Sequence, residues 1–321
     1  TGRNGGAQAN QPGDFACGTD ATANGPNATA VGEAANADGN GASAFGNNAN
    51  AEGDNSTAVG ETANAQGTGA SAFGHGANAT GNGATAGGDG AQATANGATA
   101  YGSGANAANT NATALGNGAT ALGEGDTAVG NGATANGTSA VAVGNLSNAQ
   151  GAGAVAVGGG AVANGDASTS VGLGAGVNSS GLRNTFIGSD SGVNSNGEVN
   201  TAVGTRSGNN VTGNGNTAMG TDAGTGVTGN ANTATGLRSG QNVTGNANTA
   251  NGVDSGSNVM GSANTAMGSN SGNGIRGFGA PEGFRNSVFG AESGNNIQGN
   301  NNSAFGANAG NNVTGDNNIA M

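Results

Sequence analysis

Glycine recurs at every seventh position over nearly half of the chain, and this spacing constrains the fold more than any other feature. Of the 23 positions from Gly18 to Gly172 in steps of seven, 21 are glycine, with Ala95 and Asn109 as the exceptions. The residue two places earlier is Ala at every one of these positions but Ser170. A glycine in every second turn would strongly disfavour a helix. The alternation of small and other residues in the five residues that end at each glycine predicts a short β-strand.

A second pattern doubles the period, because the residue before the glycine is apolar only in alternate units. The apolar series contains Cys17, Val31, Phe45, Val59, Phe73, Tyr101, Leu115, Val129, Val143, Val157 and Val171, with Gly87 as a gap. The intervening units carry polar residues such as Asp38, Glu52 and Gln66. The true repeat is therefore a 14-residue unit with two strands and two tight turns. Stacking of such repeats predicts an all-β parallel solenoid with alanines facing inward.

Beyond Gly172 the repeat lengthens to a 16-residue unit. The motif Asn-Thr-Ala-apolar-Gly, or a close variant of it, ends at Gly188, Gly204, Gly220, Gly236, Gly252 and Gly268. Val211, Val227, Val243, Val259 and Ile275 take the inward position that Ala holds earlier. We therefore divide the chain into a 14-residue block, 1–172, and a 16-residue block, 173–321, with an inserted loop at 277–286. Because the repeat is in register near both ends, we expect a segment of a longer chain.

The residue before each glycine points out of the coil, since it alternates with the inward alanines. An apolar column of this length exceeds the apolar patch that a soluble monomer usually exposes, so it predicts self-association. The predicted oligomer interface consists of Val31, Phe45, Val59, Phe73, Tyr101, Leu115, Val129, Val143, Val157, Val171, Val203, Met219, Met267, Phe289 and Phe305.

Composition argues against most other functions. The net charge of −12 argues against nucleic acid as a partner. No apolar run is long enough for direct membrane insertion by this segment. His75 is the only His and Cys17 the only Cys, so we expect no catalytic site and no intrachain disulfide. The acidic residues do not recur at a ligand-forming spacing, and no cofactor or metal is predicted.

Columns of Asn and Thr allow two interpretations. They comprise Asn36, Asn50, Asn64, Asn78 and Asn106, and Thr201, Thr217, Thr233, Thr249 and Thr265. Identical side chains that stack can hydrogen-bond along the rod and stabilise it. A regular Thr surface can instead order water, as in ice-binding solenoids. We favour stabilising ladders, because only one Thr per strand recurs.

The inserted loop is the best candidate for a specific contact. It carries Phe278, Pro281, Glu282, Phe284 and Arg285 in an otherwise aromatic-poor chain. Aromatic side chains beside a proline suit either a recognition loop or a clamp onto a neighbouring protomer. The sequence leaves both interpretations open.

The pentads also carry a resemblance to a known family. The first block resembles the heads of YadA-type trimeric autotransporter adhesins, which repeat a Ser/Ala-x-Ala-x-Gly pentad on a 14-residue period. The second block, with Asn200-Thr201-Ala202-Val203-Gly204, is similar to head-repeat variants of these adhesins and to phage tail-fibre repeats. The resemblance implies a left-handed β-roll, three of which pack side by side as a homotrimer. It also implies display outside the bacterial cell, with the anchor in regions outside this chain.

We therefore expect a non-enzymatic head or fibre segment of a bacterial surface adhesin that attaches to cells or surfaces at many points. The alternatives are a phage tail-fibre shaft and a solenoid that binds ice or another abiotic surface.

Overall fold

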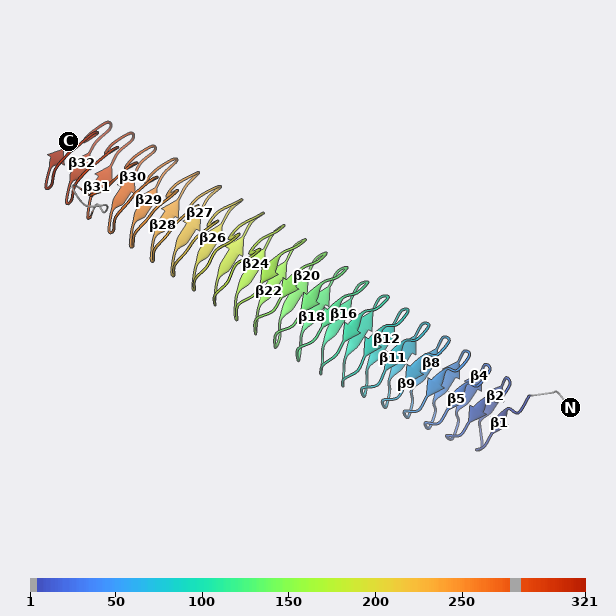
Figure 1. Cartoon of the computed structure of the whole chain (residues 1–321). Helices are drawn as coiled ribbons and strands as arrows, with labels where there is room; N and C mark the ends of the chain where they lie inside the picture. The colour runs from blue at the N-terminus through green and yellow to red at the C-terminus, as the bar shows by residue number, and fades with distance from the viewer. Residues whose placement is uncertain (1–4, 278–283) are drawn as a thin grey trace. The chain divides into compact units, whose positions relative to one another are not determined.

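The computed structural model describes residues 5–277 and 284–321, which form 33 β-strands and no helix. The chain divides into two compact units, Thr1–Gly153 and Ala154–Met321. In each unit the strands stack in parallel, each against its equivalent one turn along the chain (Figure 1). The predicted parallel β-solenoid is confirmed.

Unit 1 has two strands in each turn, as the 14-residue period predicts. The three-residue strands, which form its long-strand sheet, are β2 (Phe15–Cys17), β4 (Thr29–Val31), β6 (Ser43–Phe45), β8 (Thr57–Val59), β10 (Ser71–Phe73), β12 (Thr85–Gly87), β14 (Thr99–Tyr101), β16 (Thr113–Leu115), β18 (Thr127–Val129) and β20 (Val141–Val143). The two-residue strands, which form its short-strand sheet, are β1 (Gln8–Ala9), β3 (Thr22–Ala23), β5 (Asn36–Ala37), β7 (Asn50–Ala51), β9 (Asn64–Ala65), β11 (Asn78–Ala79), β13 (Gln92–Ala93), β15 (Asn106–Ala107), β17 (Thr120–Ala121), β19 (Thr134–Ala135) and β21 (Asn148–Ala149).

Alanine fills the interior of unit 1. Ala28 and Ala30 project inward from the long-strand sheet, Ala35 and Ala37 project inward from the short-strand sheet, and all four are fully buried. Alanine loses almost no side-chain entropy on burial, and its small size lets the two sheets approach closely. Each strand residue pairs with its equivalent one turn on, as Ala30 does with Ala44.

The glycines at the two corners of each turn are needed for different reasons. Gly46 has a φ of 139°, which L side chains rarely adopt, and a Cβ there would lie 2.4 Å from the carbonyl oxygen of Gly60. At the other corner, Gly39 needs no unusual φ, but a Cβ would lie 2.0 Å from the Gly53 carbonyl oxygen. Close stacking of the turns therefore strongly favours glycine at both corners, and only the second corner holds other residues, Ala95 and Asn109.

Unit 2 begins with the last 14-residue turns and continues with 16-residue turns. Its strands are β22 (Val155–Val157), β23 (Val162–Ala163), β24 (Thr169–Val171), β25 (Thr185–Ile187), β26 (Thr201–Val203), β27 (Thr217–Met219), β28 (Thr233–Thr235), β29 (Thr249–Asn251), β30 (Thr265–Met267), β31 (Ser287–Phe289), β32 (Ser303–Phe305) and β33 (Ile319–Ala320). The three-residue strands and β33 form the long-strand sheet of this unit.

In the 16-residue turns, single β-bridges replace the short strand. Asn196 bridges to Thr212 and Thr212 to Thr228, each one turn further along the chain. Val211 and Val227, each the residue before a bridge, are buried as the sequence predicts. The two extra residues thus widen one side of the turn while the long-strand sheet keeps its form.

Candidate functional site

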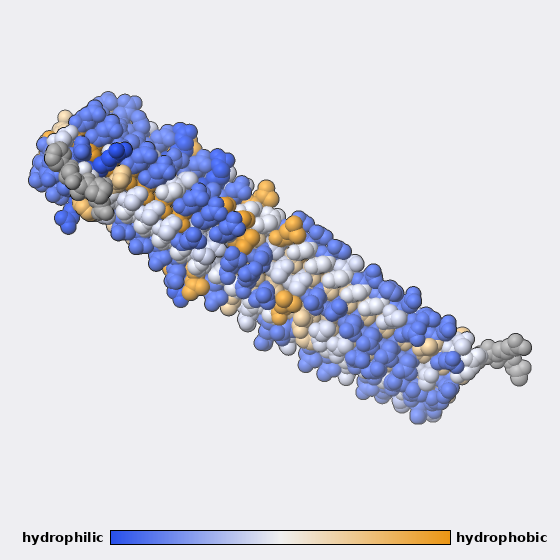
Figure 2. Space-filling model, in the orientation of Figure 1, coloured by the Kyte–Doolittle hydropathy of each residue, from blue (hydrophilic) through white to orange (hydrophobic). Residues whose placement is uncertain are grey.

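The third residue of each long strand projects outward. In each unit these residues form a column, and we call the residues of both columns the ladder. In β6 and β10, Phe45 and Phe73 are 39% and 40% exposed, whereas Ala44 and Ala72 beside them are fully buried. Every residue of the predicted interface lies at this position in its strand. On the face shown in Figure 2, exposed apolar side chains lie within a mostly polar surface. That the ladder is an interface remains a prediction.

Register brings ladder residues of successive turns into contact. Phe289 pairs with Phe305 across β31 and β32. Their rings stack with centroids 5.3 Å apart and planes 3° from parallel. These two ladder side chains thus already pack against one another, which reduces the conformational entropy that they would lose on binding a partner.

The opposite, short-strand sheet of unit 1 carries an amide ladder. The Nδ2 group of Asn36 donates to Oδ1 of Asn50 (3.1 Å), Asn50 donates to Asn64 (3.1 Å), and Asn64 to Asn78 (3.0 Å). The predicted stabilising ladder is confirmed for these residues. Asn106 lies in the same column, but its strand neighbours are Gln92 and Thr120, so it has no identical partner.

The prediction that the stacked Thr side chains hydrogen-bond to one another along the rod is wrong. Thr201, Thr217 and Thr233 do stack in register on adjacent long strands. Their side chains are half-buried, and no hydroxyl of this column bonds to the next within the described residues. The hydrogen bonds that link these turns come from the residue before each Thr.

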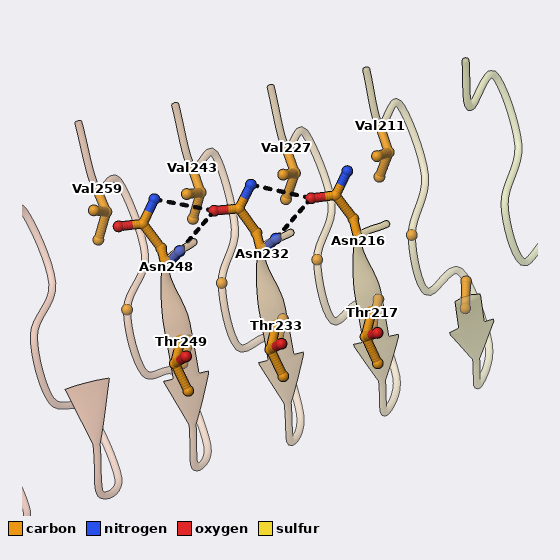
Figure 3. A pocket seen from close by; sticks show the side chains of 18 of the residues that line it. Val211, Asn216, Thr217, Val227, Asn232, Thr233, Val243, Asn248, Thr249 and Val259 are labelled. Carbon is orange, nitrogen blue, oxygen red and sulfur yellow. Dashed lines mark hydrogen bonds between the residues drawn. The ribbon is translucent and has the colours of Figure 1, made fainter. Parts of the chain in front are cut away.

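That residue is a buried Asn, and sequence reasoning missed its role. Oδ1 of Asn216 accepts from the backbone N–H (2.9 Å) and from Nδ2 (3.0 Å) of Asn232, and Nδ2 of Asn232 also donates to the carbonyl of Gly245 (2.9 Å). Asn248 bonds to Asn232 in the same way, as Figure 3 shows. The alternation within the motif Asn-Thr-Ala places Asn on the inward side with Ala, so the sequence did contain the pattern that identifies it.

The interior of the 16-residue turns leaves no room for a small molecule. Its cavity, between the Asn column and the column that includes Val211 and Val227, measures about 20 Å³. This volume is close to the space that one water molecule requires. The Asn column is therefore a structural element of the core and does not form a ligand pocket.

Charged side chains pair at the corners of the turns. Nδ1 of the exposed His75 lies 2.8 Å from Oδ1 of Asp89, and this hydrogen bond raises the pKa of His75. Nε of Arg238 lies 2.6 Å from Oδ1 of Asp254, and this pairing lowers the pKa of Asp254. Asp126 differs, because its carboxylate is buried, and desolvation raises its pKa.

The described residues contain no group of three or more His, Cys, Asp or Glu side chains that could hold a metal ion. They also contain no helix long and apolar enough to cross a membrane. Cys17 is exposed at the ladder position of β2 and carries a free thiol.

The inserted loop is only partly described. Phe278, Pro281 and Glu282 lie outside the described residues. Phe284 is 40% exposed, and its backbone N–H donates to Oδ1 of Asn300 at 2.9 Å. The backbone N–H of Arg285 donates to the Ser262 carbonyl. A recognition loop and a clamp onto a neighbouring protomer both stay predictions for this segment.

Comparison with protein families gives the identity of the repeat. Eight segments, most of which overlap a neighbour, match the YadA head domain repeat, at residues 9–35, 23–49, 37–63, 51–77, 65–91, 107–133, 121–147 and 149–175. Their starting points are separated by whole 14-residue turns, in phase with the turns of the structure. Residues 9–175 therefore carry YadA head repeats.

YadA head repeats are adhesin repeats of trimeric autotransporters, and the chain is accordingly an adhesin-type fibre segment. The matched segments all lie within residues 9–175, so the family model matches the 14-residue block and its junction with the longer turns. The family is one of surface-exposed adhesins and is not an enzyme family. No curated protein significantly matches the sequence.

Proposed function

We propose that this chain is part of the head of a bacterial surface adhesin, that it assembles as a homotrimer through the ladder, and that it attaches to cells or surfaces at many points. The observation that carries the proposal is the outward apolar column on the long strands of a YadA head repeat. YadA-like heads are self-associating trimers, and this column gives the chain a surface for that association.

Burial supports this assignment. Phe45 is 39%, Tyr101 54% and Met219 47% exposed in the single chain, and each lies at the ladder position. Exposed apolar area on a soluble protein favours contact with a partner at roughly 25 cal/mol per Å² removed from water. The partner must match a 14-residue or 16-residue repeat over many turns. A second copy has the same repeat, because its sequence is identical.

Attachment then follows from repetition. Assembly of three copies places three equivalent outer surfaces on one particle, so weak contacts act together. The polar outer surface of unit 1, with amide ladders and acidic side chains such as Asp38 and Glu52, stays accessible for such contacts. The proposed location is extracellular, with the anchor elsewhere in the full protein.

The test compares attachment by assembled and dissociated chains. Phe45→Asp combined with Phe73→Asp places two carboxylates in the ladder of unit 1 and should dissociate the assembly. The control, Gln66→Asp combined with Thr94→Asp, has the same two-turn spacing but lies on the exposed short-strand side. Binding to cultured mammalian cells and to polystyrene should fall on the order of 100-fold for the first pair only. Equal attachment by the dissociated variant would overturn the proposal of multivalent binding.

A further inference from the structure

The ladder is interrupted at three positions, and the structure compensates each interruption. In unit 1 the residue at the ladder position of β12 is Gly87. In unit 2 the ladder positions of β28 and β29 are the polar Thr235 and Asn251. Each interruption removes an apolar side chain from a surface that is apolar in the neighbouring strands.

At the first interruption a neighbouring aromatic ring fills the gap. A Cβ at Gly87 would lie 2.5 Å and 2.6 Å from two ring carbons of Tyr101, the ladder residue of the next turn. The ring of Tyr101 therefore covers Gly87, which is buried, while Tyr101 itself remains 54% exposed. The apolar surface continues across the turn that lacks a ladder side chain.

At the other two interruptions the apolar residue lies two positions later, at the corner. Leu237 follows Thr235 and is 40% exposed, and Val253 follows Asn251 and is 43% exposed. In the flanking turns, where the ladder residue is apolar, the same corner position holds small or polar residues: Ser189, Thr205, Thr221 and Ser269. Leu173, beside Val171, is the apolar exception and lies where the period changes.

The two corner residues form one patch. They lie in adjacent turns, since the carbonyl of Leu237 accepts a hydrogen bond from the N–H of Asp254 at 2.9 Å. The patch is bounded by the ion pair in which Nε and Nη2 of Arg238 donate to the two carboxylate oxygens of Asp254, at 2.6 Å and 2.7 Å. An apolar centre with a charged rim is the arrangement found at protein interfaces.

We propose that Leu237 and Val253 carry the contact with a second copy of this chain at the two turns where the ladder is polar. The proposal rests on the self-association described above, and it shifts the contact from the strand to the corner in these turns. A partner that contacted a single turn would not require compensation at each interruption. A partner that follows the long strands turn by turn would require an apolar side chain at every turn. Another copy of the chain is such a partner, because it has the same 16-residue spacing.

The first test measures assembly. Leu237→Asp combined with Val253→Asp is compared with Thr205→Asp combined with Thr221→Asp, which occupy the same corner position two turns earlier. Both pairs replace exposed or corner side chains, so folding of a single chain should be retained. Only the first pair should lower the guanidinium concentration at which the oligomer dissociates, measured by light scattering. Equal behaviour of the two pairs would overturn the inference.

The second test needs no destabilising charge. In a Cys17→Ala background, Leu237→Cys and Thr205→Cys are each labelled with a maleimide. The thiol at 237 should react at least 10-fold more slowly in the oligomer than in chains dissociated by Phe45→Asp with Phe73→Asp, whereas the thiol at 205 should react alike in both. Equal reactivity at both positions in a confirmed oligomer overturns this inference alone. A wild-type chain that is monomeric overturns the proposed self-association itself.

Discussion

The guanidinium of Arg206 donates two hydrogen bonds to the carboxylate of Asp222, which lies one turn later, with Nε–Oδ1 at 2.7 Å and Nη2–Oδ2 at 2.9 Å. Arg238 repeats this geometry with Asp254, and Asp190 precedes Arg206 in the same column. Side chains one turn apart therefore carry opposite charges, and side chains two turns apart carry like charges. Because the 16-residue repeats are nearly identical, this alternation opposes a strand pairing that skips one repeat.

Exchanging the first pair, Arg206→Asp with Asp222→Arg, tests this role. The composition is unchanged, but side chains two turns apart now carry opposite charges along the column. Pairing between strands that are two turns apart is therefore favoured. Recovery of protease-resistant protein after dilution from guanidinium should fall several-fold. The control Arg206→Asn with Asp222→Asn removes the exposed ion pair, whose contribution to stability is small, and creates no attraction across two turns. If both variants recover equally, lost stability explains the effect and the register role is wrong.

The buried Asn column should dominate the stability of the 16-residue turns. Asn232→Ala removes the acceptor for the backbone N–H of Asn248 and the donor to the carbonyl of Gly245. Loss of the partners of one buried N–H and one partly buried carbonyl should cost about 2–4 kcal/mol. Hydrogen exchange of the amides in turns 216–248 measures this locally, which suits a repeat array.

The matched control for that experiment is Thr233→Ala, one residue along the same strand. Its side chain is half-buried and points to the other side of the strand, so we expect a change of about 0.5 kcal/mol or less. Comparable exchange in the two variants would show that the Asn column does not hold the turns together.

Asp126 gives a pH dependence with a defined sign. It takes the inward position that Ala holds in the adjacent turns, and it accepts hydrogen bonds from the N–H groups of Ala140 and Gly123, both at 2.7 Å. Because its folded-state pKa is raised, the folded chain binds more protons than the unfolded chain between the ordinary and the raised pKa. Its contribution to stability is therefore lost as the pH rises through that window.

The variant Asp126→Ala removes this titration. The free energy of unfolding of both proteins is measured by denaturation at pH 3 and at pH 7. The value for the variant minus the value for the wild type should be larger at pH 7. A difference that is constant, or that changes in the opposite direction, would contradict the raised pKa.

Phe186 should hold the junction between the two repeat lengths. It takes the inward position of β25 between Ser170 and Ala202 and is 3% exposed. A Cβ at Gly192 would lie 2.2 Å from its ring, so the facing glycine makes space for it. Phe186→Ala should cost about 3–5 kcal/mol through the cavity left behind, measured by calorimetry. Thr185→Ala, beside it and half-buried, should have little effect, and equal losses would argue against this packing role.

Periodicity was sufficient to predict the architecture. The 14-residue spacing of Ala30, Ala44 and Ala58 gives the strands, their register and their inward side, because only small residues fit between closely packed sheets. The outward direction of Phe45 follows from the same alternation. These features repeat in every turn, so local exceptions do not obscure them.

Contacts between side chains of neighbouring turns were harder to predict. The inward direction of Asn232 follows from alternation, but a buried amide needs partners that only the next turn supplies. The contact of the Tyr101 ring with Gly87 depends on the orientation of the ring. The burial of Phe186 depends on the space that the glycine at position 192 leaves for its ring. Side-chain contacts between turns are set by three-dimensional packing, which a repeat pattern does not encode.

Self-association through the ladder sets the mass of the protein in solution. Light scattering after gel filtration measures the mass of the assembly directly. We expect about 88 kDa, three copies of a 29.3 kDa chain, and a return to 29.3 kDa for Val129→Asp combined with Val157→Asp. A wild-type mass of 29.3 kDa would leave the apolar ladder facing water and would contradict self-association.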